Sequence, residues 1–506
     1  MLSREIRIRE VTHMSLINIR DLTFSYEGSY DNIFEHISLS IDTNWKSGLI
    51  GRNGRGKTTF LKLLLGEYKY TGKIESNVEF EYFPYDIKNE DDFTFDVAAE
   101  KNPGLEYWQI ARELNLLEVS EDILYRPFSA LSYGEKVKVM IAVLFTRENS
   151  FLLIDEPTNH LDLYGRSRLA EYLNTKKGFI LVSHDRDFLD KCADHIIAIN
   201  KTSIAVQKGN FSTWDENKRR SDAFEISYNE KLRSEIMHLE QAKQRTKNWA
   251  DISEKRKDEC ERGENYIGRR PWLGRKSKKM MKRSKSIEQR IDTAVEEKKK
   301  LLKDIEHSDK LKLRPIKNMN GTMLELRNVS IFYGDRRITD RVSFSVRSGD
   351  RINISGKNGS GKSSILKLIM GEDISHEGEI YKRSGLIISY VSQDTSYLKG
   401  RLAEYADEND IDEALFKTIL RKLDFDRVQF DKDMSSFSEG QKKKTLIAAS
   451  LSKPAHLYIW DEPMNYIDVL SRIQIENLIR EYSPAMVFVE HDSAFCRKAA
   501  TETVRL

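Results

Sequence analysis

The sequence predicts an α/β fold made of two similar domains in tandem, joined by a long α-helical hairpin. Three observations predict this architecture. The chain of 506 residues repeats itself at an interval of about 305 positions. Within each copy, short apolar runs typical of buried strands alternate with helical patterns. Between the copies lies a charged segment of about 100 residues with few glycines or prolines, which favours helix.

These features divide the chain into consecutive parts. We expect residues 1–13 to be either a disordered extension or the result of an upstream start, and a first domain over residues 14–214. A basic helical hairpin follows over residues 215–317, with its tip at about 263–285, and a second domain covers residues 318–506.

Composition narrows the class of protein. Hydrophobic residues make up 39% of the chain and charged residues 32%, and the net charge is +3. The sequence contains no run of about 18 apolar residues, so we expect no membrane span. The N-terminal residues lack the apolar core of a secretory signal. The three cysteines lie far apart, which fits a reducing compartment, and we expect a cytoplasmic protein.

The first copy contains a complete phosphate-binding loop between a strand pattern and a helix pattern. Residues 51–58 read GRNGRGKT. Its glycines let backbone N–H groups turn toward phosphate oxygens, while Lys57 supplies charge and Thr58 a hydroxyl for Mg²⁺. The candidate nucleotide-binding residues are Gly51, Asn53, Gly54, Gly56, Lys57, Thr58 and Thr59.

Two adjacent carboxylates follow the buried strand pattern FLLI of the same copy. Because α/β sheets bind ligands at the carboxyl ends of their strands, Asp155 is suited to hold Mg²⁺ and Glu156 to act as general base. A Ser-x-Gly turn at Ser132 and Gly134 precedes a helical pattern and offers a second phosphate contact. Together these residues predict an ATPase that uses ATP and Mg²⁺.

The second copy repeats each of these features. The spacing from Ser132 to Asp155 equals that from Ser438 to Asp461, 23 positions in both cases. The repeated candidates are Gly356, Asn358, Gly359, Gly361, Lys362, Ser363 and Ser364 in the loop, Ser438 and Gly440 in the turn, and Asp461 and Glu462 after the strand. The sequence therefore predicts two ATP sites.

Each copy resembles the nucleotide-binding domain of ATP-binding cassette (ABC) proteins, because LSYGE and FSEGQ are similar to the family's signature motif. The resemblance implies catalytic roles for the switch histidines His184 and His491. It implies that Tyr26 and Tyr333 stack on adenine. It also implies that Gln393 contacts Mg²⁺ and the attacking water.

The same resemblance implies a monomer whose two cassettes close on ATP as an intramolecular sandwich. Lys57 would then face Ser438 and Gly440 across one ATP, and Lys362 would face Ser132 and Gly134 across the other. The segment His160-Leu161-Asp162 matches the loop that crosses between the cassettes in the family.

The two copies depart from the family pattern in different ways. Tyr85 stands where the second copy has Gln393, and Met464 stands where the first has Thr158. Tyr133 replaces a signature glycine and Phe437 its leucine. We therefore expect unequal sites, with slower turnover at the site that contains Tyr85.

The positive charge of the chain is concentrated in the segment between the copies. Residues 218–317 contain 30 Lys and Arg against 18 Asp and Glu, and residues 262–285 contain ten basic residues and one acid. Basic side chains interleaved with aromatic ones suit RNA binding. The RNA-binding candidates are Arg269, Arg270, Trp272, Arg275, Lys276, Lys278, Lys279, Lys282 and Arg283.

Helical spacing of apolar residues predicts the two helices of the hairpin. The first is expected to run to about Arg262 and the second to begin at about Ser277, after a break rich in glycine. Apolar residues recur every three to four positions in the first helix, which indicates a seam against the second. These seam residues are Phe224, Tyr228, Leu232, Ile236 and Leu239.

Twin cassettes joined by a charged linker resemble the ABC-F family. GRNGRGKT and the run KRSK at residues 282–285 are similar to its antibiotic-resistance branch, the Lsa- and Vga-type proteins. The chain has no basic tail after His491, and in this it resembles Lsa-type members more than Vga-type members. The resemblance implies binding to the ribosomal exit (E) site, near 23S rRNA and P-site tRNA, and ATP-dependent expulsion of lincosamides, pleuromutilins and streptogramin A.

Two other functions remain open from the sequence. A translation factor of the same family would act on the ribosome without a drug role. The ATPase subunit of an exporter would use the same cassettes, but that function does not explain the long basic linker.

Overall fold

The computed structural model describes residues 15–27, 32–159, 161–200, 203–261, 270–301, 311–313, 315–316, 321–334, 336–357, 359–425 and 427–506. The expected extension at residues 1–13 lies outside these residues. The chain forms two compact units, one containing residues 15–214 and 311–506, the other within Asp215–His307. We call residues 15–214 the first cassette, residues 311–506 the second cassette and the other unit the hairpin. No helix among the described residues is long and apolar enough to cross a membrane.

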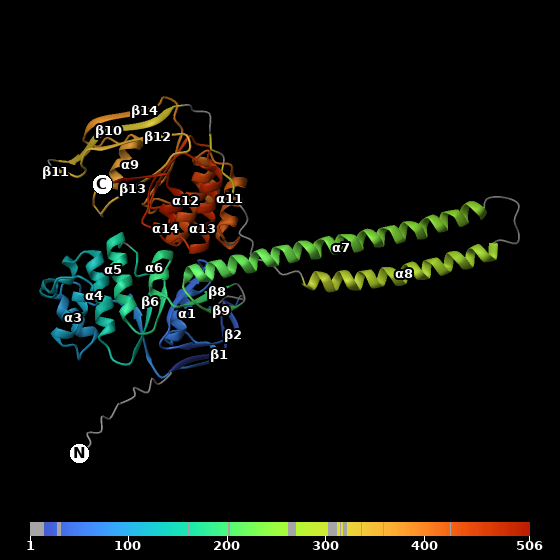
Figure 1. Ribbon diagram of the computed structural model, residues 1–506, viewed down its shortest axis with the longest axis horizontal. Coiled ribbons are helices and arrows are strands. Elements are labelled where there is room, and N and C mark those ends of the chain that lie inside the picture. The colour runs from blue at the N-terminus through green and yellow to red at the C-terminus, as the bar shows by residue number, and fades with distance from the viewer. Residues whose placement is uncertain are drawn as a thin grey trace, which may run out of the picture. The chain divides into compact units, whose positions relative to one another are not determined.

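The first cassette combines a parallel sheet with an antiparallel one (Figure 1). The strands of the larger sheet, in spatial order, are β5 (Glu79–Phe83), β6 (Ser150–Asp155), β7 (Phe179–Val182), β3 (Lys46–Gly51), β8 (His195–Ile199) and the antiparallel β9 (Ile204–Lys208). The smaller sheet orders β2 (Phe34–Asp42), β1 (Leu16–Phe24) and β4 (Thr71–Glu75). Strands β3, β6 and β7 run parallel to one another, so their carboxyl ends lie at one edge of the sheet, next to the phosphate loop, the paired carboxylates and His184.

The second cassette repeats this plan. Its parallel sheet orders β15 (Ile388–Val391), β16 (Leu457–Asp461), β17 (Met486–Val489), β13 (Arg351–Ser355) and β18 (Glu502–Arg505). Its antiparallel sheet is built on β10 (Thr322–Tyr333), which pairs with β11 (Arg336–Arg337), β12 (Val342–Arg347) and β14 (His376–Lys382). The α/β tandem expected from the sequence is confirmed.

Helices surround the parallel sheets. Those of the first cassette are α1 (Lys57–Leu64), α2 (Thr94–Lys101), α3 (Tyr107–Leu116), α4 (Tyr133–Phe145), α5 (Leu163–Thr175) and α6 (Arg186–Cys192). Those of the second are α9 (Lys362–Met370), α10 (Leu402–Glu408), α11 (Glu413–Lys422), α12 (Glu439–Ser452), α13 (Val469–Tyr482) and α14 (Ser493–Ala499). Leu311 and Leu313, which the sequence placed in the linker, are buried in the helical core of the second cassette.

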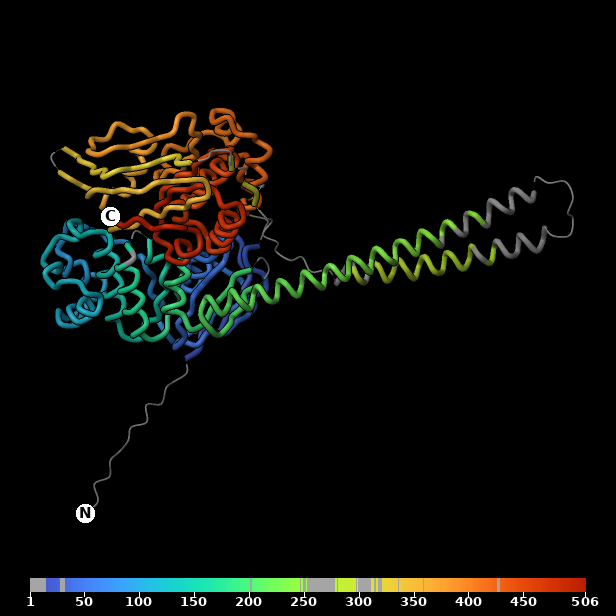
Figure 2. The backbone as a smooth tube through the Cα atoms, turned by 45° about the horizontal axis from the view of Figure 1, so that its top comes forward, coloured from blue at the N-terminus to red at the C-terminus, as the bar shows by residue number. Residues whose placement is uncertain are grey.

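The hairpin is formed by α7 (Phe211–Glu261), whose first turn belongs to the first cassette, and by α8 (Arg270–Leu301). The two helices lie side by side and antiparallel over their described parts (Figures 1 and 2). Lys243 Nζ donates to Asp292 at 2.7 Å, and Lys298 forms an ion pair with Glu235. The second helix begins at Arg270, not at Ser277 as expected. Pro271 lies in its first turn, where a backbone N–H would have no helical acceptor, so proline is tolerated there.

The predicted seam is only partly correct. Leu232 and Ile236 are buried, and Leu239 is half-buried. Phe224 is 71% exposed and Tyr228 42% exposed. The described part of α8 ends at Leu301, and the Lys298–Glu235 pair puts that end close to Leu232 along α7. The described part of α8 is therefore too short to cover the two aromatic rings.

A buried ion pair provides a stability test within the second cassette. Lys444 Nζ lies 2.9 Å from Asp468 Oδ2, with both side chains almost fully buried. Lys444→Met leaves that carboxylate without its cation, so we expect a loss of about 3 kcal/mol in unfolding free energy, measured by urea denaturation. The corresponding Lys138 is only half-buried, and it donates to the Leu117 carbonyl as Lys444 does to the equivalent Leu423 carbonyl. Lys138→Met should cost clearly less, and equal losses would contradict the assignment.

Candidate active site

The phosphate loops of both cassettes have the same backbone geometry. Gly56 and Gly361 each have φ of 88° and precede the first residue of a helix. A Cβ atom at Gly56 would lie 2.7 Å from Ile33 Cγ2, so both the conformation and the space require glycine. Lys57 Nζ donates to the Gly51 carbonyl at 3.0 Å, and Lys362 Nζ to the Gly356 carbonyl at 3.0 Å. The loops thus hold their lysines over the helix N-termini, where phosphate binds.

The side chains proposed to hold a cation lie together in each cassette. Thr58 Oγ1 donates to Asp155 Oδ2 at 2.8 Å, and Ser363 hydrogen-bonds Asp461. Burial raises the pKa of Asp155 and raises that of Asp461 to about 6. Among the described residues, Asp461 Oδ1 is buried and has no hydrogen-bond partner. A buried carboxylate with an unsatisfied oxygen beside a hydroxyl fits a hard divalent cation.

An exposed aromatic ring stands beside each phosphate loop. The Tyr26 hydroxyl lies 2.8 Å from Thr59 Oγ1, and the Tyr333 hydroxyl lies 3.1 Å from Ser364 Oγ. The residues are 43% and 54% exposed, respectively. These hydroxyl contacts fix each ring at the edge of a cavity and leave it accessible for stacking on a base.

The first site is a cavity of about 420 Å³ that contains residues of both cassettes. It is lined by Tyr26, Asn53, Gly54, Gly56, Lys57, Thr58, Thr59, Asp155, Glu156, Asn159 and His184, with Ser438 and Tyr466 from the second cassette. Asn53 Nδ2 donates to the Tyr466 carbonyl at 2.8 Å. A Cβ atom on Gly440 would lie 2.9 Å from the same nitrogen, so this glycine permits the close approach of the cassettes. Lys57 and Ser438 are thus brought to one cavity.

The second site is a cavity of about 450 Å³. It is lined by Tyr333, Gly359, Gly361, Lys362, Ser363, Ser364, Gln393, Glu462, Asn465 and His491, with Leu161 and Arg166 from the first cassette. Asn358 and His160 lie outside the described residues. Ser132 caps α4 as Ser438 caps α12. Among the described residues, neither Ser132 nor Gly134 lines this cavity, so their pairing with Lys362 stays a prediction.

The glutamate of the second site is surrounded by donors. Glu462 Oε2 accepts from Gln393 Nε2 at 3.0 Å and from Asn465 Nδ2 at 2.7 Å. His491 Nε2 lies 3.3 Å from Oε1. Burial alone would raise the pKa of Glu462, but the contact with His491 and the nearby lysines lower it overall. This carboxylate is therefore ionised and oriented, as a general base requires.

The glutamate of the first site has a different environment. His184 Nε2 lies 3.1 Å from Glu156 Oε1, but that oxygen has no hydrogen bond of good geometry within the described chain. Burial, together with the charge of Asp155, raises the pKa of Glu156 to about 8. Tyr85 does not replace Gln393, because it packs against the helical core with Lys101 Nζ 5.0 Å from its ring centre. Burial and the charge of Lys57 also lower the pKa of His184 well below its usual value.

Sequence reasoning missed several residues of these sites. Asn159 and Asn465 each follow the glutamate of the Asp-Glu pair by three positions, and Arg166 and Arg472 recur at the same interval of 306. That repetition was an available signal. The contact of Tyr466 with Asn53 was not, because only its carbonyl oxygen takes part and a backbone group leaves no mark in the sequence.

Both sites thus combine a phosphate loop, a buried Asp-Glu pair, a histidine and residues of the opposite cassette. The family model described as ABC transporter matches residues 34–159 and 339–465, together half of the chain. The chain belongs to the ABC transporter family. Since the matched regions are ABC ATPase domains, the protein binds and hydrolyses ATP.

Curated relatives extend the similarity beyond the two ABC domains. The ribosome protection protein VmlR of Bacillus subtilis is 28% identical over 94% of this chain and 84% of its own length. The energy-dependent translational throttle protein EttA of Haemophilus influenzae is 24% identical over 93% of this chain and 88% of its own. The chain is an ABC-F ATP-binding protein with two ABC domains.

A solved structure shares the fold across both ABC domains. An archaeal ribosome recycling factor, solved in complex with a ribosomal stalk protein, superposes with a TM-score of 0.62 at 18% identity. The superposition covers 96% of this chain and 87% of the other. At this identity the match supports the tandem ABC fold alone.

Proposed function

We propose that this ABC-F ATPase is a ribosome-protection protein. The observation that carries the proposal is a basic helical hairpin between two ATPase domains, in a chain similar over 94% of its length to the ribosome protection protein VmlR. The hairpin would enter the exit (E) site, beside P-site tRNA. Its tip would approach 23S rRNA at the peptidyl-transferase centre and dislodge lincosamides, pleuromutilins and streptogramin A.

The described part of α8 has the surface that such a role needs. Lys278, Lys279, Lys282 and Arg283 are all exposed and lie within two helical turns of one another. A row of exposed cations on one helix neutralises successive phosphates, which is how proteins grip a nucleic acid backbone. The backbone of Arg270, Trp272, Arg275 and Lys276 is also helical, whereas Arg269 lies outside the described residues.

ATP binding and hydrolysis would control when the protein binds the ribosome and when it leaves. Mg²⁺ held by Thr58 with Asp155, and by Ser363 with Asp461 and Gln393, would supply charge neutralisation at the phosphates when bound. The signature turns of the opposite cassettes would close over the two nucleotides and fix the hairpin in place. Hydrolysis by Glu462 and Glu156 would reopen the cassettes and release the protein from the ribosome in the cytoplasm.

A translation factor without a drug role is the second candidate. It is favoured by the similarity to EttA, whose length the chain covers as fully as that of VmlR. Drug susceptibility separates the two, because only a protection protein changes growth in a lincosamide or a pleuromutilin. Cells that carry the gene on a plasmid should tolerate more drug, and the Glu156→Gln/Glu462→Gln double variant should lose that protection.

Ribosome binding is tested with the same double variant, which retains both phosphate loops and should stay closed on ATP. We expect it to co-sediment with 70S ribosomes in ATP and to remain in the supernatant in ADP. Lys57→Ala/Lys362→Ala, which loses phosphate contacts in both loops, serves as the unbound control. Absence of the double variant from the ribosome pellet in ATP would contradict the proposed function.

A further inference from the structure

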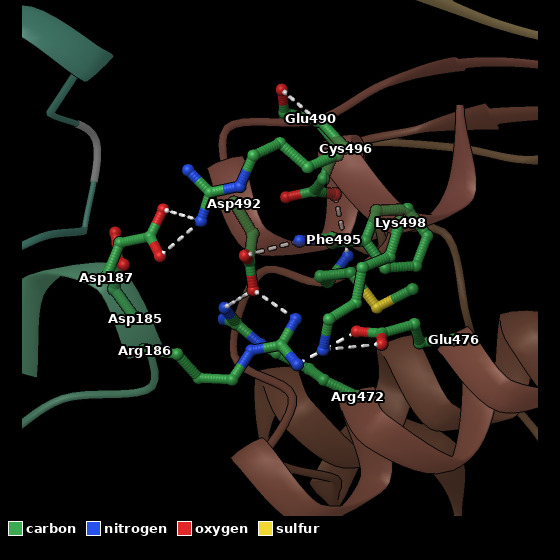
Figure 3. A network of polar contacts seen from close by, with 12 residues as sticks. Asp185, Arg186, Asp187, Arg472, Glu476, Glu490, Asp492, Phe495, Cys496 and Lys498 are labelled. Atoms are coloured by element: carbon green, nitrogen blue, oxygen red, sulfur yellow. Dashed lines mark hydrogen bonds and ion pairs between the residues drawn. The ribbon is translucent and has the colours of Figure 1, made fainter. Parts of the chain in front are cut away.

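An arginine of the first cassette is buried among carboxylates of the second. Arg186, the first residue of α6, is 4% exposed. Its Nη1 lies 2.8 Å from Glu476 Oε2 on α13, and its Nη2 lies 3.5 Å from Asp492 Oδ2 (Figure 3). Burial alone would raise the pKa of Asp492, but Arg186 and Arg472 outweigh burial and lower it. The boundary between the cassettes therefore contains a charge cluster whose own members line neither ATP cavity.

Two members of the cluster lie next to the switch histidines in the sequence. Arg186 follows His184 by two positions, and Asp492 follows His491 by one. Because His184 lines the first cavity and His491 the second, the contact between Arg186 and Asp492 joins the two segments by a short polar path.

Each switch segment is also tied to the loop that reaches the opposite site. Arg166 donates from Nε to the Leu161 carbonyl at 2.9 Å and from Nη1 to Asp185 at 3.0 Å. In the second cassette, Arg472 donates to the Ile467 carbonyl at 2.9 Å and to Asp492 at 3.3 Å. The contacts of Arg166 and Arg472 are equivalent in the two cassettes. Arg186 has no such counterpart, because Ser493 occupies the equivalent position.

We propose that Arg186 is a positioning residue that transmits the nucleotide state of the first site to the second, by linking the His184 segment to the His491 segment. Its guanidinium is incompletely satisfied, since among the described residues its Nε and Nη2 are buried without hydrogen-bond partners. A small movement of α6 toward Asp492 would complete the contact. Unsatisfied buried charge favours such a second arrangement, which is what coupling between two sites requires.

The chain should remain folded without this arginine. Glu476 keeps Lys498, whose Nζ lies 3.0 Å away, and Asp492 keeps Arg472. Arg186→Ser copies the residue at the equivalent position of the second cassette, so it removes the link and leaves each carboxylate with a cation.

The test measures steady-state ATP hydrolysis of the full chain. Lys57→Ala removes a phosphate contact of the first site and so changes its nucleotide occupancy, and coupling should then slow the second site at least roughly fivefold. Arg186→Ser in the same background should relieve most of that slowing. The proposal is overturned if the slowing is unchanged in the double variant, or if Lys57→Ala alone causes none.

A control separates coupling from a general loosening of the boundary. Arg497 Nη2 lies 2.8 Å from Asp187 Oδ1 between α6 and α14, a contact that involves neither a switch histidine nor Asp492. Arg497→Ala should leave the slowing intact, and equal relief by this variant would count against Arg186. If the serine variant does not fold, Arg186→Lys carries the test. A single ammonium cannot hold Glu476 and Asp492 together, so partial relief is expected and no relief would overturn the proposal.

Discussion

Glu462→Gln is expected to lower steady-state ATP hydrolysis about 100-fold or more, and Glu156→Gln to cause a loss at least roughly tenfold smaller. Glu462 is ionised and held by Gln393, Asn465 and His491, so the amide removes a base that is ready to act. The raised pKa of Glu156 keeps it largely protonated near neutral pH, and Tyr85 offers it no donor. The first site therefore accounts for little of the steady-state ATP hydrolysis of the unaltered chain.

The comparison needs proof that both variants still bind ATP. Both changes spare Lys57 and Lys362, so the dissociation constant for ATP should stay within about twofold of that of the unaltered chain. A group that acts only in the transition state contributes little to the binding of the ground state. Gln393→Ala removes one hydrogen-bond donor from Glu462, so it should bring the rate of ATP hydrolysis at the second site closer to that at the first. Equal loss of hydrolysis in the two glutamine variants would show that the sites are equivalent after all.

Replacing Lys278, Lys279, Lys282 and Arg283 with glutamine is expected to lower affinity for ribosomes about 100-fold at physiological salt, if the proposed function holds. Each lost phosphate contact removes about one released counterion, so the slope of log affinity against log salt should fall by about 3. Sedimentation at several salt concentrations measures both quantities. Basal ATP hydrolysis should be unchanged, because the residues lining the two cavities come from the cassettes.

Arg219 and Arg220 provide a matched control for two of these cations. They are 60% and 72% exposed on α7, but each forms an ion pair with an acid one turn earlier, Asp215 and Glu216. Because their charge is already compensated, neutralising this pair should change ribosome affinity far less than neutralising Lys278 and Lys279. Full retention of binding by the fourfold variant would place the contact surface elsewhere.

Most of the residues that line the two cavities are ones that the repeat in the sequence singled out. Phosphate loops, paired carboxylates and switch histidines depend on short contiguous motifs, whose backbone geometry is set by local residues such as Gly56. The predictions that were only partly correct concern contacts with residues far along the chain. Phe224 has the spacing of a seam residue, yet the described part of α8 ends before it reaches that turn of α7. Spacing along one helix carries no information about the length of its partner.

By itself, the sequence determined that this protein has two cassettes, two copies of the phosphate-loop and Asp-Glu motifs, and a basic segment between them, because each property resides in local composition or in a contiguous motif. Only the tertiary structure decided which residues meet across the cassettes: Ser438 with the first loop, Arg166 at the second site, and Arg186 with Asp492. It also decided that Glu156 and Glu462 differ. The pKa of a carboxyl group depends on burial and on donors contributed from far along the chain, which adjacent letters do not encode.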